Sequence, residues 1–223
     1  MLGVIYLFNI FSKEGLALFL FTLPALLLSL SIHEFAHAYT AYKLGDMSQK
    51  YRGRLTLDPL KHIDIVGFLC IMLCGFGWGK PVQIVDTNFK NRAKGNAIVA
   101  FAGPFSNILL AIFFAIVIKI LSMTGVLGLM ATNNIGIILI QMLSVTIYFN
   151  IVFAVFNMLP IPPFDGSKVL FYFLPRKYKN IMYTLEKYSL IILLVLIITN
   201  VHYYIVGPIV NFLQYLLILF INL

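Results

Sequence analysis

The chain has 223 residues, of which 61% are hydrophobic and only 11% are charged. Because about a quarter of the residues in a soluble domain are charged, this composition excludes an ordinary soluble protein and favours one that crosses a membrane several times. The formal net charge of +8 would suit a nucleic-acid-binding protein, but the basic residues lie in short loops beside apolar segments. Membrane orientation accounts for them better, and we expect no nucleic-acid partner.

The apolar segments predict an all-α polytopic membrane protein with five or six transmembrane helices. Residues 1–12 are apolar but too short to span a bilayer core of about 30 Å, so we expect an interfacial segment there. Five longer segments predict membrane-spanning helices: 15–43, 96–121, 135–158, 181–201 and 203–222. No linker or internal repeat divides them, and we expect one transmembrane domain over 1–223.

Three shorter elements are expected between the first two spans. Residues 65–78 are apolar and rich in glycine, but they are too few for a span and predict a re-entrant element or a shallow helix. Short membrane-associated β-strands are expected near 50–57, where apolar and polar residues alternate, and near 79–86. Pro81 would restrict the second of these strands to the edge of a sheet.

The basic residues predict the orientation of the chain. Fourteen of the sixteen Lys and Arg residues fall in three connecting stretches, 43–64, 79–94 and 160–187, whereas the connections 122–134 and 200–206 contain none. The positive-inside rule therefore predicts that the three basic stretches face the cytoplasm. This arrangement requires 65–78 to leave and return on the same side of the membrane. The helix over 15–43 then ends at the cytoplasmic side.

The second half of that first helix carries the pattern His33-Glu34-x-x-His37. Residues four apart share a helix face, so both imidazoles can bind one ion. Ionisable side chains inside a membrane span are costly and usually functional, which weakens a purely structural explanation of this cluster. The pattern predicts a zinc site with one ion per chain, in which Glu34 handles a water molecule as general base.

A catalytic zinc site needs a third protein ligand and an open coordination position. Asp165 is the best candidate because it follows a span directly, within the proline-rich segment 160–166. Prolines prevent the helix from continuing, and irregular backbone at membrane depth is tolerated only inside protein or beside water. The alternative is that Asp165 caps a short helix over 166–173.

Several longer motifs around these residues resemble the site-2 protease family of intramembrane zinc metalloproteases, peptidase family M50. The resemblance is to its small bacterial branch without a PDZ domain. It rests on these segments: 33–38, 53–64, 77–82, 102–107 and 156–166. The family pattern usually has Leu before the Asp-Gly pair, whereas this chain has Phe164 there, which leaves Asp165 in place.

The resemblance implies a zinc-dependent intramembrane endopeptidase of the cell membrane, with its active site toward the cytoplasm. It implies that His33, His37 and Asp165 bind zinc and that Glu34 acts as general base and acid. The implied partners are the lipid bilayer and a transmembrane protein substrate. The sequence does not name that substrate or the oligomeric state.

Two asparagines within spans have less certain roles. The resemblance implies that Asn157 contacts the substrate or its oxyanion, but from the residues alone a helix–helix hydrogen bond is an equal alternative. For Asn107 we favour helix packing, because Gly103 lies one turn before it on the same helix face.

Two other classes of function remain open at this point. One is an inactive homologue that binds transmembrane partners without cutting them, although the intact His, Glu and Asp set argues against it. The other is a metal transporter, which predicts several polar sites along a path rather than one cluster.

Overall fold

The computed structural model describes residues 13–74 and 77–222, and every named element in these ranges is helical. The long helices are α2 (Lys13–Lys43), α5 (Arg92–Met123), α7 (Asn134–Asn157) and α11 (Val201–Asn222). The shorter α-helices are α3 (Ser48–Tyr51), α4 (Ile65–Cys74), α6 (Val126–Met130), α8 (Asp165–Phe173), α9 (Lys179–Lys187) and α10 (Ser189–Thr199). Three 3-10 turns complete the set: η1 (Pro59–Lys61), η2 (Asp86–Asn88) and η3 (Arg176–Tyr178).

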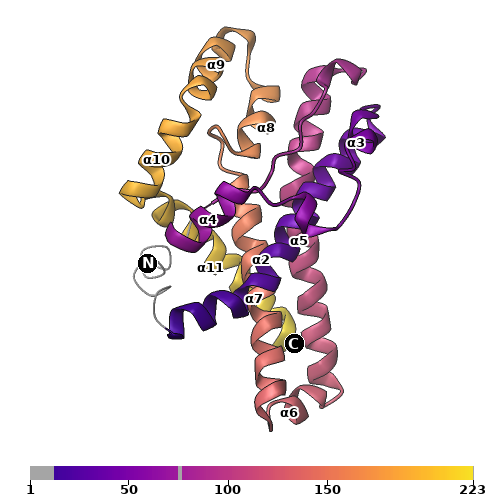
Figure 1. Ribbon diagram of the computed structural model, residues 1–223, viewed down its shortest axis with the longest axis vertical. Coiled ribbons are helices and arrows are strands. Elements are labelled where there is room, and N and C mark those ends of the chain that lie inside the picture. The colour runs from indigo at the N-terminus through magenta and orange to yellow at the C-terminus, as the bar shows by residue number, and fades with distance from the viewer. Residues whose placement is uncertain (1–12, 75–76, 223) are drawn as a thin grey trace.

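Helices α2, α5 and α7 form the centre of the bundle, and α5 packs against both of the others (Figure 1). At one end α6 joins α5 to α7, and α11 lies against both of these helices. At the opposite end α8 packs on α5. The main hydrophobic cluster joins Ala111 and Ala115 of α5 to Ile147 and Ile151 of α7. Alanines at these positions let the two backbones approach closely.

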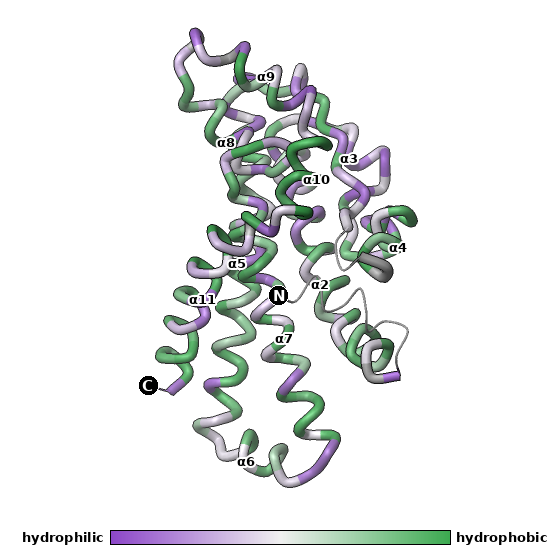
Figure 2. The backbone as a smooth tube through the Cα atoms, turned by 90° about the vertical axis from the view of Figure 1, so that its left-hand side faces the viewer, coloured by the Kyte–Doolittle hydropathy of each residue, from purple (hydrophilic) through white to green (hydrophobic). Residues whose placement is uncertain are grey.

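The helix lengths and compositions indicate a multi-pass membrane protein. Within 13–74 and 77–222, four helices are long and apolar enough to cross a membrane, namely α2, α5, α7 and α11. Helices α9 and α10 pass the same test only as a pair, and they are bent by 66° at their junction. Figure 2 shows hydrophobic positions along the lower bundle and hydrophilic positions gathered around α3 and α9. The described residues therefore contain four candidate spans, or five if the bent pair is one span, and only the second count falls within the expected five or six.

A sixth span would require one of the short apolar segments to cross the membrane. Helix α4 has ten residues and a length of about 15 Å, half of what a span needs. That length is typical of a re-entrant or shallow helix, and the return to the same side stays a prediction. The expected interfacial segment over 1–12 lies outside the described residues.

The predicted β-strands are not found among the residues that the structure describes. Around 50–57 the chain instead forms the last turn of α3, and Gly53 then reverses it with a φ of +64°. The segment 79–86 is extended until η2, but its one described ladder contact is an isolated bridge between Ile63 and Gly79. Side chains rather than a sheet hold these loops together.

Asp46 is the centre of that arrangement. Its side chain is fully buried just after α2 and accepts four hydrogen bonds of 2.9–3.1 Å. The donors are the main-chain N–H groups of Ser48 and Val85 and the side-chain amides of Gln49 and Asn88. Burial by itself raises the pKa of Asp46, but these donors outweigh it and lower that pKa from 3.8 to about 2.

We expect Asp46→Asn to lower the free energy of unfolding by about 2 kcal/mol, which is the energy equivalent of the lowering from 3.8 to about 2. In the unsubstituted protein the contribution is fully present above about pH 4. It is lost as the pH falls through the folded-state pKa, because the folded state has the lower pKa. Thermal unfolding in detergent as a function of pH measures both effects. Asp58→Asn is the matched control, since that carboxylate is exposed, and an equal loss in both variants would contradict the assignment.

Candidate metal site

Three side chains from distant parts of the chain converge where α2, α5 and α8 meet. The Nε2 atoms of His33 and His37 lie 3.0 Å apart, and Oδ2 of Asp165 lies 3.2 and 3.1 Å from them respectively. All three side chains are largely buried. Two imidazole lone pairs and a carboxylate directed at one point repel one another unless a cation lies between them. The group therefore fits a metal ion, and neutral imidazoles with a carboxylate are typical zinc ligands.

A chain of buried hydrogen bonds determines which nitrogen of His33 carries the proton. It starts at two main-chain carbonyls, which can only accept: Asn150 Nδ2 donates to Thr146 O at 2.8 Å, and Asn107 Nδ2 donates to Ser29 O at 3.0 Å. Asn107 Nδ2 also donates to Oδ1 of Asn150 at 2.8 Å. The amide oxygen of Asn107 therefore faces Nδ1 of His33 at 2.7 Å, and that nitrogen must donate. The lone pair of His33 then lies on Nε2, toward Asp165.

His37 is oriented by the same neighbouring helix. Its Nδ1 donates to the main-chain carbonyl of Val99 at 2.7 Å, which leaves the Nε2 lone pair for the metal group. Helix α5 comes this close because it has Gly103 opposite both rings. A Cβ atom at Gly103 would lie 2.5 Å from Nε2 of His37 and 2.7 Å from Cε1 of His33. No side chain fits there, so the glycine is a requirement of the site.

Asp165 is the first residue of α8, and its carboxylate does not cap that helix. One oxygen faces the two histidines, and the other lies 3.9 Å from Nζ of Lys168. As a metal ligand, Asp165 would bind through its ionised carboxylate.

Glu34 is buried directly after His33, and its Oε2 atom has no hydrogen-bond partner among the described residues. The nearest cation is the guanidinium of Arg54, whose Nη2 lies 3.9 Å from that oxygen. Arg54 is itself buried and donates to the carbonyls of Lys61 and Lys80. Arg54 thus joins two loops beside α2 and places a positive charge near the carboxylate of Glu34.

The predicted residues differ in how the structure places them. His33, His37 and Asp165 come together, although Asp165 is 128 residues after His37. Asn157 makes no described hydrogen bond to these three side chains. Its amide donates to Phe153 O of its own helix at 2.9 Å. His62, which we did not expect to be a ligand, bonds Thr56 O at 2.7 Å and belongs to the loop above the site.

Two residues have a larger role than the sequence suggested. Asn107 does join helices, as expected, but it also orients His33, and Asn150 in turn orients Asn107. Their only sequence signal is that each is an amide within an apolar span, with Gly103 one turn before Asn107. That signal predicts burial and packing, but it does not reveal which ring the amide contacts.

Comparisons with known proteins agree with this geometry. A family model described as Peptidase family M50 matches residues 118–200, which include α7 and Asp165. The protein YwhC of Bacillus subtilis (strain 168) is 37% identical over 196 residues, which cover 88% of each chain. Rip2 of Mycolicibacterium smegmatis is 31% identical over 188 residues, which cover 81% of this chain and 68% of that relative.

A third relative is MJ0611 of Methanocaldococcus jannaschii, which is 30% identical over 169 residues, or 76% of this chain and 78% of that protein. All three relatives are named as candidate zinc metalloproteases. No solved structure matches the chain. The names of the relatives and the chemistry of the three donors agree on zinc as the cofactor.

We expect Gly103→Ala to reduce zinc binding severely, because the added Cβ would displace the rings of His33 and His37. Zinc bound per chain, measured by mass spectrometry after dialysis against a weak chelator, should fall at least tenfold. Gly128→Ala is the matched control, since a Cβ there meets nothing within 4 Å. Equal zinc content in the two variants would contradict the packing argument.

Asn107→Leu should weaken zinc affinity by about 10- to 100-fold, the usual cost of losing the residue that orients a metal-ligating histidine. Competition with a fluorescent chelator measures the affinity directly. Ser144→Ala serves as control, because its hydroxyl bonds Ile140 O within α7 and has no link to the site. If Asn107→Leu keeps the original affinity, His33 does not depend on that hydrogen bond.

Proposed function

Because this chain belongs to peptidase family M50, we propose that it is a site-2-type endopeptidase that hydrolyses peptide bonds within or beside transmembrane segments of other proteins. The observation that carries the proposal is the buried group of His33, His37 and Asp165, with Glu34 adjacent. Both histidines and Glu34 lie on α2, which is long and apolar enough to span a membrane. Family membership supports a zinc metalloprotease, and the apolar helices support the lipid bilayer as its surroundings. The whole chain acts as one transmembrane domain.

Each residue of the group has a distinct task in this proposal. His33 and His37 offer Nε2, and Asp165 offers Oδ2, to hold the zinc ion. When bound, zinc supplies a Lewis acid that activates water and polarises the scissile carbonyl. Glu34 accepts the proton of the attacking water and delivers it to the leaving amine. Arg54 places its positive charge 3.9 Å from Oε2 of Glu34, beside the carboxylate that acts in this first step.

We assign Asn157 to the carbonyl of the substrate. Its amide donates one hydrogen bond to Phe153 O, while its second N–H makes no hydrogen bond to any described residue. Asn157 is the last residue of α7 and precedes Asp165 by eight positions, across the proline-rich turn. A free N–H at that place suits the negative charge that develops on the substrate oxygen during attack.

The charge distribution supports an active site toward the cytoplasm. Fourteen of the sixteen basic residues lie in stretches at or beyond the end of the bundle that holds the metal group, and Figure 2 shows hydrophilic positions concentrated there. A substrate helix hides its carbonyls in its own hydrogen bonds. It must therefore unwind locally before Glu34 can direct water at one of them.

Glu34→Gln should abolish cleavage of a membrane-embedded substrate, with a loss of about 10²- to 10⁴-fold, because glutamine cannot accept the proton. Zinc content should stay unchanged, since Glu34 is not among the three donors. The assay uses the purified full chain in lipid vesicles with a fluorogenic transmembrane peptide.

Glu14→Gln is the matched control near the start of the same helix, and it should cleave normally. Full activity in Glu34→Gln would refute the protease mechanism. Zinc moving across the vesicle membrane, with no cleavage by any form, would indicate a transporter instead. Peptide binding without cleavage in both forms would indicate an inactive homologue.

A further inference from the structure

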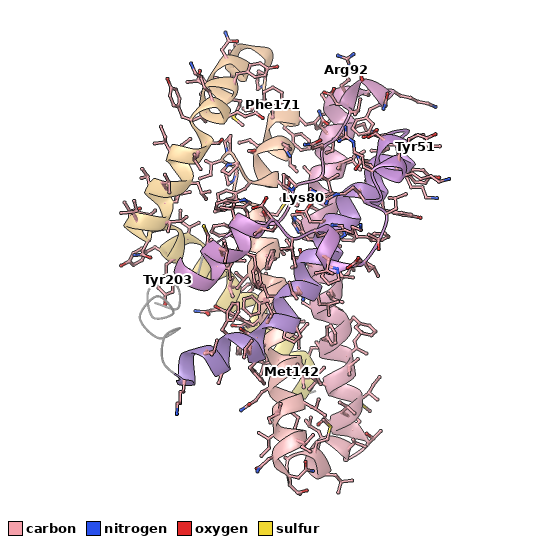
Figure 3. The ribbon with its side chains drawn as sticks, viewed as in Figure 1. Tyr51, Lys80, Arg92, Met142, Phe171 and Tyr203 are labelled. Atoms are coloured by element: carbon pink, nitrogen blue, oxygen red, sulfur yellow. The ribbon has the colours of Figure 1, made fainter. Side chains whose placement is uncertain are left out.

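A polar cleft opens beside the metal group, between the segment 82–86, the start of α5, α8 and α9. Its volume of about 430 Å³ lies within the ~300–1,000 Å³ typical of ligand sites. Phe171, labelled in Figure 3, packs its ring 5.6 Å from that of Tyr183 and forms the wall between α8 and α9. The polar lining residues are Asp86, Asn96, Ser167, Lys168, Tyr183 and Glu186.

Two independent helices place this cleft one turn from the metal group. On α5, Asn96 lies three residues before Val99, whose carbonyl accepts the hydrogen bond of His37. On α8, Lys168 lies three residues after Asp165, and its Nζ is 3.9 Å from Oδ1 of that ligand. Three helical residues correspond to about 4.5 Å. An extended polypeptide cut at the metal group therefore has this cleft as the adjoining space for its next residues.

The free charge in the cleft is negative, although the chain as a whole has a net charge of +8. Asp86 accepts one hydrogen bond from Nδ2 of Asn96 at 3.2 Å, and neither Asp86 nor Glu186 forms an ion pair with any described residue. Lys168, the one described cation of the lining, is paired with Asp165. The described carboxylates elsewhere already have partners or belong to the metal group: Glu34, Asp46, Asp58, Asp64 and Asp165.

We propose that this cleft binds the stretch of substrate that flanks its transmembrane segment, as an extended chain with a Lys or Arg that pairs with Asp86 and Glu186. The proposal rests on the protease function proposed above. Basic residues are the ones that commonly flank membrane spans on the cytoplasmic side, so the occupant is chemically available in such substrates. This pairing makes the enzyme prefer substrates whose transmembrane segment has a basic flank. It also holds the unwound segment beside Glu34.

The test measures binding separately from cleavage. The probe is a synthetic peptide with an apolar segment of about twenty residues and a lysine-containing flank, compared with a matched peptide whose flank has glutamines. Both are titrated into the full zinc-loaded chain carrying Glu34→Gln in zwitterionic micelles, with fluorescence anisotropy as readout. Adding Asp86→Asn with Glu186→Gln should raise the Kd of the lysine peptide about five- to tenfold and leave that of the glutamine peptide unchanged. The difference should shrink at high salt.

Two further variants make the test specific. Lys187→Gln changes a charge next to Glu186 but outside the cleft, and it should not raise the Kd of the lysine peptide. Glu186→Lys should tighten binding of a third peptide with a glutamate flank. Equal effects on all peptides, no effect on any, or no binding of the lysine peptide would overturn the cleft as a binding site.

Cleavage is then measured with Glu34 restored, so that the two proposals fail separately. If the peptides are cleaved but the substitutions at Asp86 and Glu186 do not change the Kd, the protease proposal stands and the cleft proposal is wrong. If binding depends on both carboxylates but no peptide is cleaved, the cleft proposal stands and the protease proposal is wrong.

Discussion

Polar groups buried in an apolar bundle must find their partners inside the protein, because the bilayer offers no water to satisfy them. The metal group of this chain meets that constraint through three helices. The amide nitrogen of Asn107 donates to Ser29 O of α2 and to Oδ1 of Asn150 of α7, and the amide oxygen of Asn107 accepts a hydrogen bond from Nδ1 of His33. Since Asn107 and Asn150 donate to the main-chain carbonyls of Ser29 and Thr146, which can only accept, the direction of the whole chain is fixed. One wrong residue in it would leave several buried atoms unpaired.

Helix α5 carries most of this arrangement on one face. Its residues Val99, Gly103 and Asn107 follow one another at intervals of four, so they lie in a single stripe. The first supplies a carbonyl to His37, the second supplies the space for both rings, and the third orients His33. The stripe continues through Ala111 and Ala115, which pack on α7. The same close helix approach thus builds both the core and the site.

The polar end of the bundle relies on charges in place of a sheet. Asp46 gathers four donors from two loops, and Arg54 bonds carbonyls of the same two regions while it stands beside Glu34. These loops lie next to the metal group, and Val82, Ile84 and Asp86 form one wall of the neighbouring cleft. The acidic side chains that the structure describes are therefore concentrated in the loops, in the candidate metal group and in the cleft next to it.

Composition and local pattern determined much of this protein. Apolar segments located the long helices to within a few residues, and the spacing of His33 and His37 put two donors on one helix face, because both signals depend only on neighbours along the chain. The proline-rich segment after a span pointed to Asp165, as did the family motifs, yet its meeting with the histidines required α8 to pack on α5. Only the tertiary structure decided the tautomer of His33, the absence of the predicted strands from the described residues, the bend between α9 and α10, and the carboxylates that face one cleft. These features arise from contacts between residues far apart in sequence, where an amide or a carboxylate acquires its role from the partner that packing brings to it.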